Sequence, residues 1–207
     1  DGNLPGIEFS FPESYSKEDR PEGIQIDSGW AIETIGEHEI RWKLNFYKEP
    51  IEIEEVRGVS VFANGKLAQK SFFFNLTGGL NGQHGQEYLS GQVVADFVDQ
   101  LEFDIISPER QRINWEDENA MPLESWGQGK IKELLRIWKR NRGEKRQKQI
   151  EAKLEGFTER INKFQKHEQK IVRSTLQKLG SISTLNDEQF NNLGASMIHA
   201  WEQGRLQ

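Results

Sequence analysis

The chain has 207 residues, a net charge of −6 and no cysteine. Without cysteine it can have neither a disulfide bond, nor a thiolate metal site, nor a cysteine nucleophile. It contains no apolar run of roughly 18 residues, which argues against a membrane span, and its length and composition fit a cytoplasmic protein of one large domain or two small ones.

The charge is divided unevenly along the chain. Residues 1–129 carry 10 Lys and Arg against 24 Asp and Glu, a net charge of −14, whereas residues 130–207 carry 17 against 9, a net charge of +8. This asymmetry predicts an acidic body and a basic arm. Solvated helices that are simply rich in lysine would give the same asymmetry.

Residues 1–27 are rich in Pro, Gly, Ser and acidic residues and show little periodicity, so we expect a poorly ordered or loosely docked entry segment. The sequence begins at Asp1, without Met and without the apolar core of a signal peptide. This beginning predicts an internal piece of a larger protein.

Residues 28–127 are predicted to form a β-rich domain. After the apolar run at 30–35, alternate residues from position 40 are large and apolar, which places them on one face of a strand: Ile40, Trp42, Leu44 and Phe46. The pair Asn64-Gly65 lies between two strand-like runs and supplies the positive φ angles of a type I′ turn, so a hairpin is expected over about 57–75.

Two further segments complete this domain. Residues 78–85 are Gly-rich but lack the spacing of a phosphate-binding loop, and a mobile loop is the better interpretation. Residues 89–98 are apolar on both faces, which is typical of a central strand.

From residue 128 onward, the sequence predicts a basic helical region. The first helix is expected from about Glu124, with an apolar stripe and an interruption at Gly143. A second apolar series follows a spacing that fits either a short coiled coil or an antiparallel helical hairpin: Ile150, Leu154, Phe157, Ile161, Phe164 and Ile171. The last helix is expected to begin at an Asn186–Gln189 cap, to pack through one face, and to stop at Gly204; that face holds Phe190, Leu193, Met197 and Trp201.

Strands followed by helices predict the α+β class, with a mixed β-sheet, helices packed on it and a helical extension. Chemically, the sequence offers an acidic cluster: Asp96, Asp99, Glu102 and Asp104. Paired carboxylates can hold Mg²⁺ in a nuclease. However, no lysine follows closely, and on a strand Asp96 and Asp99 would face opposite sides, so solvated strand ends are the simpler interpretation. The four histidines are scattered and predict no metal site.

A more promising segment is ISPERQRINW, which carries Arg110, Gln111 and Arg112 after Pro108. Arginine binds phosphate oxygens through two donors at once, so these residues could contact an anion or a neighbouring domain. The alternative is a local salt bridge from this segment to one of three nearby carboxylates: Asp104, Glu116 or Asp117.

The segment from Val59 to Arg142 resembles the transducer module of MORC-like GHKL ATPases. The resemblance is carried by VSVFANGKLAQ, by YLSGQVVADFVDQ, and by DIISPERQRINW followed by a helix that contains LLRIWKRNR. It implies a ribosomal-protein-like βαβ domain. In that superfamily, the transducer lends a basic residue to the γ-phosphate of ATP bound in the preceding domain, and so couples nucleotide state to dimerisation.

In this comparison Arg110-Gln111 aligns with the basic-Gln pair, with Arg in place of the usual Lys. The resemblance implies that ATP and Mg²⁺ belong to the parent protein, with a preceding ATP-binding domain as partner and a homodimer as assembly. The ATP-binding motifs of the family have no match in this chain, so the fragment is expected to bind no cofactor and to have no catalytic residue of its own.

Basic residues crowd around Gly143, and non-specific DNA is the expected partner: Lys139, Arg140, Arg142, Lys145, Arg146 and Lys148. The acidic body of the same chain is the rival partner for this arm. An alternative to the whole ATPase interpretation is a non-catalytic scaffold or interaction module of a defence or restriction system. A Mg²⁺-dependent nuclease is the weaker alternative.

Overall fold

The computed structural model describes residues 25–27, 30–47, 50–76 and 85–204. The chain divides into two compact units, unit 1 up to Leu135 and unit 2 from Arg136. The boundary therefore falls later than the expected 127/128 division, inside a helix. Most of the predicted entry segment, and the Gly-rich loop up to residue 84, lie outside the described residues.

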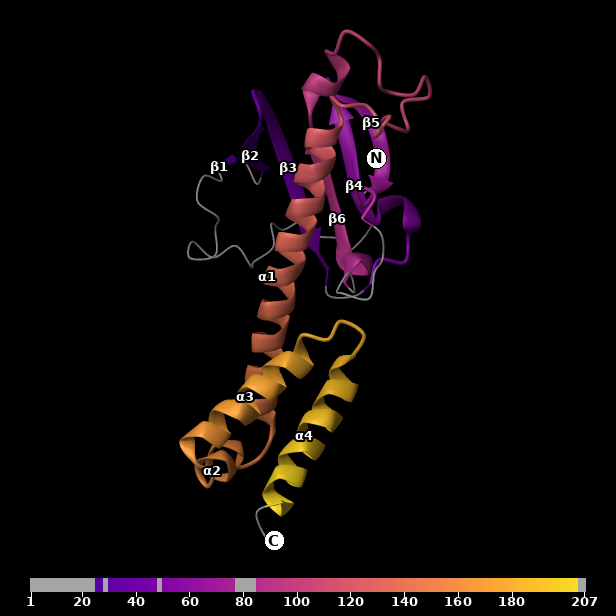
Figure 1. Cartoon of the computed structure of the whole chain (residues 1–207). Helices are drawn as coiled ribbons and strands as arrows, with labels where there is room; N and C mark the ends of the chain where they lie inside the picture. Colours follow the sequence, from indigo (N-terminus) through magenta and orange to yellow (C-terminus); the bar gives the residue numbers. More distant parts are fainter. Residues whose placement is uncertain (1–24, 28–29, 48–49, 77–84, 205–207) are drawn as a thin grey trace. The chain divides into compact units, whose positions relative to one another are not determined.

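Unit 1 is built on a six-stranded mixed sheet (Figure 1). Its strands are β1 (Gln25–Asp27), β2 (Trp30–Ile35), β3 (His38–Phe46), β4 (Gly58–Ala63), β5 (Lys66–Phe72) and β6 (Leu89–Val94), in the spatial order β1-β2-β3-β6-β4-β5. Strands β4 and β6 run parallel, and the other neighbours run antiparallel. With four α-helices after the sheet, this confirms the α+β class.

The parallel pair β4 and β6 is connected without an α-helix in the described residues. The chain between them forms β5, which pairs with β4, and the short 3-10 helix η2 (Gln86–Tyr88). The long helix that covers the sheet, α1 (Met121–Lys153), comes after β6. This connection differs from the βαβ unit that the family resemblance implies.

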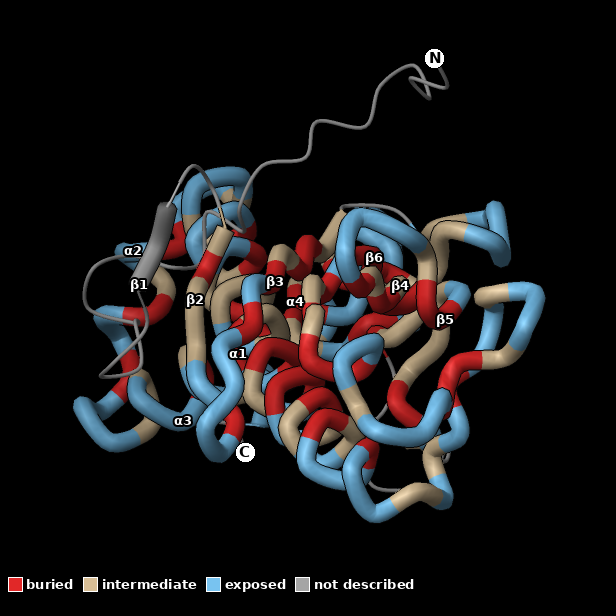
Figure 2. The backbone as a smooth tube through the Cα atoms, turned by 90° about the horizontal axis from the view of Figure 1, so that it is seen from above, coloured by how far each residue is buried: buried red, intermediate tan, exposed pale blue. Residues whose placement is uncertain are grey.

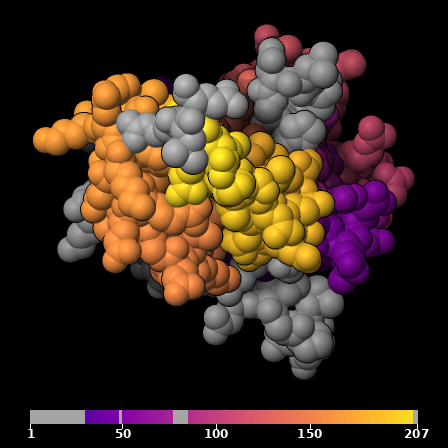
Figure 3. Space-filling view, turned by 90° about the horizontal axis from the view of Figure 1, so that it is seen from below, coloured from indigo at the N-terminus to yellow at the C-terminus, as the bar shows by residue number. Residues whose placement is uncertain are grey.

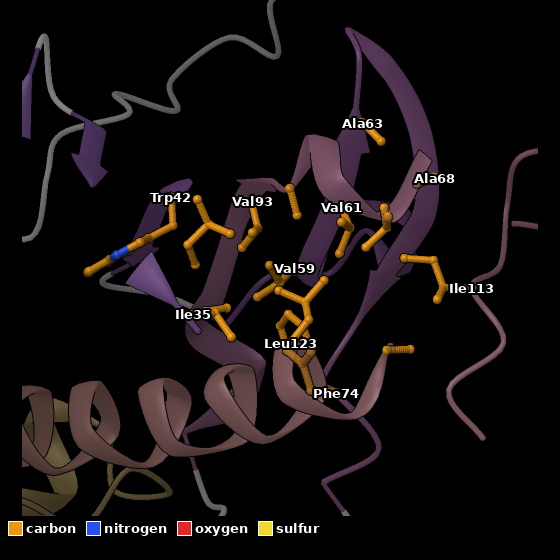
Figure 4. Close-up of a cluster of buried hydrophobic side chains, with 14 of the residues drawn as sticks. Ile35, Trp42, Val59, Val61, Ala63, Ala68, Phe74, Val93, Ile113 and Leu123 are labelled. Carbon is orange, nitrogen blue, oxygen red and sulfur yellow. The ribbon is translucent and has the colours of Figure 1, made fainter. Parts of the chain in front are cut away.

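The predicted alternation along β3 is confirmed from Ile40 to Leu44 but ends there, because Asn45 is buried and Phe46 is only partly buried. Ile40, Trp42 and Leu44 are buried, and they belong to one apolar core with Leu123 and Ile131 of α1. Figure 4 shows Leu123 and Phe74 close together between α1 and the sheet. Buried positions recur along the central strands and along α1 (Figure 2). The apolar period of β3 therefore decides which face of the sheet the helix covers.

The predicted hairpin and central strand are also confirmed. Asn64 and Gly65 have φ angles of 49° and 73°, as a type I′ turn requires, and β4 and β5 pair on either side of them. Strand β6 lies between β3 and β4, but it ends at Val94, and the end of the predicted strand instead lies in the 3-10 helix η3 (Asp96–Asp99).

The predicted interruption at Gly143 is wrong, because α1 continues through this residue to Lys153. A Cβ atom at Gly143 would lie 2.4 Å from the carbonyl oxygen of Gln177 in α3 (Lys166–Gly180). Gly143 thus allows close approach of two helix backbones, a packing role that helix propensity alone does not reveal.

The apolar series beyond Gly143 does not form one coiled-coil helix. The chain leaves α1 after Lys153, forms α2 (Phe157–Asn162) and then α3. Most of the series is nevertheless buried in a single core of unit 2, which contains Ile150, Phe157, Ile161, Phe164, Val172, Leu176, Phe190 and Ile198. Ile171 is 47% exposed, so its expected place in the series is wrong.

Helix α4 (Asp187–Gln203) packs against α3, and the two lie side by side in Figure 3. The predicted cap is confirmed: the Asn186 side chain accepts a hydrogen bond from the Gln189 amide at 2.8 Å, and the Asn186 amide donates to the Gln189 side-chain oxygen at 3.0 Å. Gly204 is the C-cap, as expected. Of the expected packing face, Phe190 is buried but Leu193 is 47% exposed.

Candidate anion-binding turn

The segment with Arg110 and Gln111 forms a closed turn at the end of a short antiparallel bridge between Ile106 and Ile113. The Arg110 amide donates to the Ser107 carbonyl oxygen at 2.7 Å, and the Ser107 amide donates to the Arg112 carbonyl oxygen at 2.8 Å. The Ser107 hydroxyl oxygen also accepts hydrogen bonds from the amides of Gln111 and Arg112. We call residues 107–112 the arginine turn.

Arg110 has a φ angle of 51°, in the left-handed region. Residues other than glycine rarely adopt this conformation, and it is maintained only where the surrounding structure enforces it. Here the enforcing contacts are the hydrogen bonds of Ser107 on both sides of Arg110. A disfavoured backbone in a surface turn is a recurrent property of functional sites.

The arginine turn is fastened to the edge strand β5. The Lys70 amide donates to the Gln111 carbonyl oxygen at 3.0 Å. The buried Gln69 side chain accepts hydrogen bonds from the Ile113 amide at 3.0 Å and from the Trp115 indole at 3.2 Å. The turn therefore has a fixed position relative to the sheet.

The guanidinium group of Arg110 lies 3.1 Å from the carboxylate of Asp99 and donates to the Leu67 carbonyl oxygen at 3.3 Å. The expected local salt bridge thus exists, but with a partner other than the three predicted ones. Asp104 instead accepts from the Ile106 amide, and Asp117 from the Asn119 amide.

The predicted acidic cluster is organised by Asn64. Asp96 and Asp99 lie in the 3-10 helix η3 (Asp96–Asp99) rather than on a strand, so the expectation that they face opposite sides is wrong. The Asn64 amide donates to Asp96 at 2.7 Å, and its side chain donates to Asp99 at 3.0 Å. Within the described ranges, no group of His, Asp and Glu side chains could hold a metal ion.

The hydrogen bond from Asn64, followed by that from Arg110, lowers the pKa of Asp99 below its ordinary value. Because the pKa is lowered in the folded state, these contacts stabilise the fold fully above the ordinary pKa of an aspartic acid. That contribution is lost as the pH falls through the lowered value.

Around this pair, the arginine turn and β5 display further cations and one side-chain amide. Lys66, Lys70, Gln111 and Arg112 are exposed, whereas the Arg110 side chain is 32% exposed. Lys66 also acts electrostatically on Asp99. Guanidinium, ammonium and amide donors at one fixed edge can bind the oxygens of a phosphate group.

In unit 2, the structure separates the basic residues predicted to contact nucleic acid. Arg146 is 5% exposed; it pairs with Asp187 at 2.9 Å and donates to the Leu185 carbonyl oxygen at 2.8 Å. Arg142 donates to the carbonyl oxygens of Ser183 and Leu185. Both arginines are thus engaged in holding the α3–α4 connection, and Arg146 is not available to a nucleic acid.

The other four predicted basic residues are nearer the surface. Arg140, Lys145 and Lys148 are exposed, and Lys139 is half-buried. These residues lie on α1, whose course from Arg136 onward belongs to unit 2.

A buried ion cluster in unit 1 was not predicted. Lys130, which is 8% exposed, lies 2.8 Å from Glu33 and 3.1 Å from Glu133, and Glu33 also accepts from the Trp126 indole at 2.7 Å. Glu33 and Lys130 are 97 positions apart in the chain, so no local sequence pattern connects them.

No helix in the part of the chain that the structure describes is long and apolar enough to cross a membrane. Comparison of the chain with models of protein families, with curated proteins and with solved structures gives no match.

Proposed function

We propose that this chain is the transducer-type module of a cytoplasmic ATPase of the MORC-like GHKL group, and that it presents the arginine turn to the terminal phosphate of ATP bound in a preceding domain. ATP and Mg²⁺ belong to that domain, and the chain alone has no catalytic site. The module couples the nucleotide state to homodimerisation. The resemblance from Val59 to Arg142 supports this proposal.

The observation that carries the proposal is the backbone of Arg110. A left-handed arginine in a turn closed by hydrogen bonds with Ser107 and fixed to β5 is costly to maintain, yet its side chain stays partly exposed. An interaction made chiefly with the charge of a transition state would account for that cost, because such contacts raise turnover rather than ground-state binding.

The first prediction concerns Arg110→Ala in the longer protein that includes the ATP-binding domain. We expect kcat to fall by about 100-fold or more, while the Kd of the nucleotide changes by less than about threefold. Steady-state ATP hydrolysis and nucleotide titration measure the two quantities. Arg110→Lys keeps the charge but not the two-donor geometry, so its kcat should lie between those of Arg110→Ala and the wild type.

The matched control is Arg57→Ala, which removes an arginine of the same unit that pairs with Glu54 at 2.9 Å. It should leave kcat unchanged, because this pair is exposed and lies in a different segment. If Arg110→Ala hydrolysed ATP at the wild-type rate, Arg110 would make only a local salt bridge. The non-catalytic scaffold would then be the better interpretation of the chain.

A second candidate function is non-specific contact of unit 2 with DNA. The observation that favours it is the exposure of Lys145 and Lys148 on α1, which remains after Arg142 and Arg146 are assigned to the fold. Few aromatic side chains lie among these lysines in the sequence, so base readout is not expected and the binding should be electrostatic.

For Lys145→Glu together with Lys148→Glu, we expect weaker binding to a random duplex and a shallower salt dependence. Two phosphate contacts change affinity roughly tenfold between about 50 and 200 mM salt, so the slope of log K against log salt should lose about 2. Lys178→Glu, an exposed lysine on α3, is the control for one such charge change. If the affinity for the duplex changed neither with salt nor in the double variant, Lys145 and Lys148 would not contact DNA. They would then face the solvent or the acidic half of the chain.

The carboxylates that suggested the nuclease alternative do not support it. Asp96 and Asp99 both accept hydrogen bonds from Asn64, and Asp99 also pairs with Arg110. These contacts use the carboxylates to organise the hairpin turn.

A further inference from the structure

The contact between Arg110 and Asp99 places a carboxylate beside the guanidinium group that we propose to bind phosphate. One oxygen of Asp99 lies 3.1 Å from Arg110, and the other accepts from the Asn64 side chain at 3.0 Å. Asn64 is itself fixed by the hairpin turn and by Asp96. Asp99 is thus held in place independently of Arg110.

The Asp99 carboxylate lies at ion-pair distance from Arg110 Nη2, yet this nitrogen is buried without a hydrogen-bond partner among the described residues. A phosphate oxygen could accept a hydrogen bond from it. The two side chains are 32% and 23% exposed, and ion pairs at such exposure contribute little to stability. A phosphate group carries more charge than a carboxylate and can accept two hydrogen bonds from one guanidinium, whereas Asp99 faces Arg110 with one oxygen, so a phosphate group can displace Asp99.

The second contact of Arg110, to the Leu67 carbonyl oxygen at 3.3 Å, is long for a hydrogen bond. It joins the Arg110 side chain to the backbone of β5. For the exposed residues Gln111 and Arg112, the described contacts are made by the backbone. Their amides donate to the Ser107 hydroxyl oxygen, and their carbonyl oxygens accept from the amides of Lys70 and Ser107. Among the contacts that the described residues make with this turn, the one with a carboxylate is made by Arg110.

We propose that Asp99 is a latch: in the absence of ligand it holds Arg110 against β5, and it competes with a polyphosphate for the guanidinium group. The inference rests on the proposed function and adds its regulation, because it makes Asp99 the group that keeps the arginine turn from binding stray anions. Removal of the Asp99 charge should therefore strengthen the binding of a polyphosphate to this chain.

The test uses the chain itself with inorganic tripolyphosphate as the probe, at constant ionic strength, followed by calorimetric titration. We expect Asp99→Asn to bind the probe about tenfold more tightly than the wild type. Adding Arg110→Ala to this variant should remove the gain. Thermal melting of each variant shows whether it is folded, and Asp99→Ser, which keeps a hydrogen-bond acceptor for Asn64, replaces Asp99→Asn if the latter unfolds.

Asp96→Asn is the matched control, because Asp96 lies in the same 3-10 helix and also accepts from Asn64, whereas the ion pair of Arg110 is with Asp99. It removes the same charge close by and should strengthen binding by less than about threefold. An equal gain in both variants, a gain that survives Arg110→Ala, or no binding of the probe to any variant would overturn the latch. The turnover of Arg110→Ala in the longer protein is a separate result, so the latch can fail while the proposed function stands.

Discussion

Replacing Phe74 by alanine is expected to lower the free energy of unfolding of unit 1 by about 3–5 kcal/mol, the usual cost of removing a fully buried phenylalanine. Phe74 is 0% exposed, and its ring lies 4.7 Å from that of Phe72 and 6.3 Å from that of Trp126. A Cβ atom on Gly127 would lie 2.3 Å from the Phe74 ring, so α1 already approaches the ring as closely as a glycine allows. The resulting cavity could not easily collapse.

Urea unfolding followed by tryptophan fluorescence measures this effect, because Trp115 and Trp126 both lie against Phe74. The control is Phe103→Ala, because Phe103 is 75% exposed. This substitution should change the free energy of unfolding by less than about 0.5 kcal/mol. If the two variants unfolded at the same urea concentration, the assignment of Phe74 to the centre of the core would be wrong.

Arg146→Met is expected to destabilise unit 2 by about 2–4 kcal/mol. Methionine fills a similar volume but donates nothing, so the carbonyl oxygens of Gly180 and Leu185 lose a donor in a buried place. Asp187 is 73% exposed at its side chain and can be hydrated, so most of the loss comes from the carbonyl groups rather than from the ion pair.

Thermal melting followed by circular dichroism at the helical band measures the loss. Hydrogen exchange at residues 181–186 should locate it in the α3–α4 connection. Lys145→Met is the matched control, because Lys145 precedes Arg146 on α1 and is exposed. A melting temperature shared by the two variants would mean that the arginine contacts contribute nothing net.

Local patterns predicted those parts of the fold that depend on neighbours in the chain. The alternation along β3 and the Asn64-Gly65 turn each require only a few consecutive residues, and so does the Asn186–Gln189 cap. For the same reason they could be read without knowledge of the tertiary structure.

The sequence could not show contacts between distant segments. From the sequence, Gly143 could either break a helix or allow two helix backbones to approach closely. The choice depends on the contact with Gln177 in another helix. Likewise the sequence suggests that Arg146 is a solvated cation, because it does not show that Arg146 lies beside the carbonyl groups of the α3–α4 connection. The sequence therefore allowed Arg110 and Gln111 to be chosen as candidate site residues, but it did not show that Asp99 would pair with Arg110.

The attachment of the arginine turn to β5 has a consequence for the solubility of the protein. An edge strand whose backbone groups are unpaired can add a strand from another molecule, and this is a common route to aggregation. Here Lys70 and Leu67 of β5 contact Gln111 and Arg110. Deleting the turn would expose this edge, so a deletion variant would confuse loss of phosphate contact with precipitation, and single side-chain substitutions are the appropriate tools.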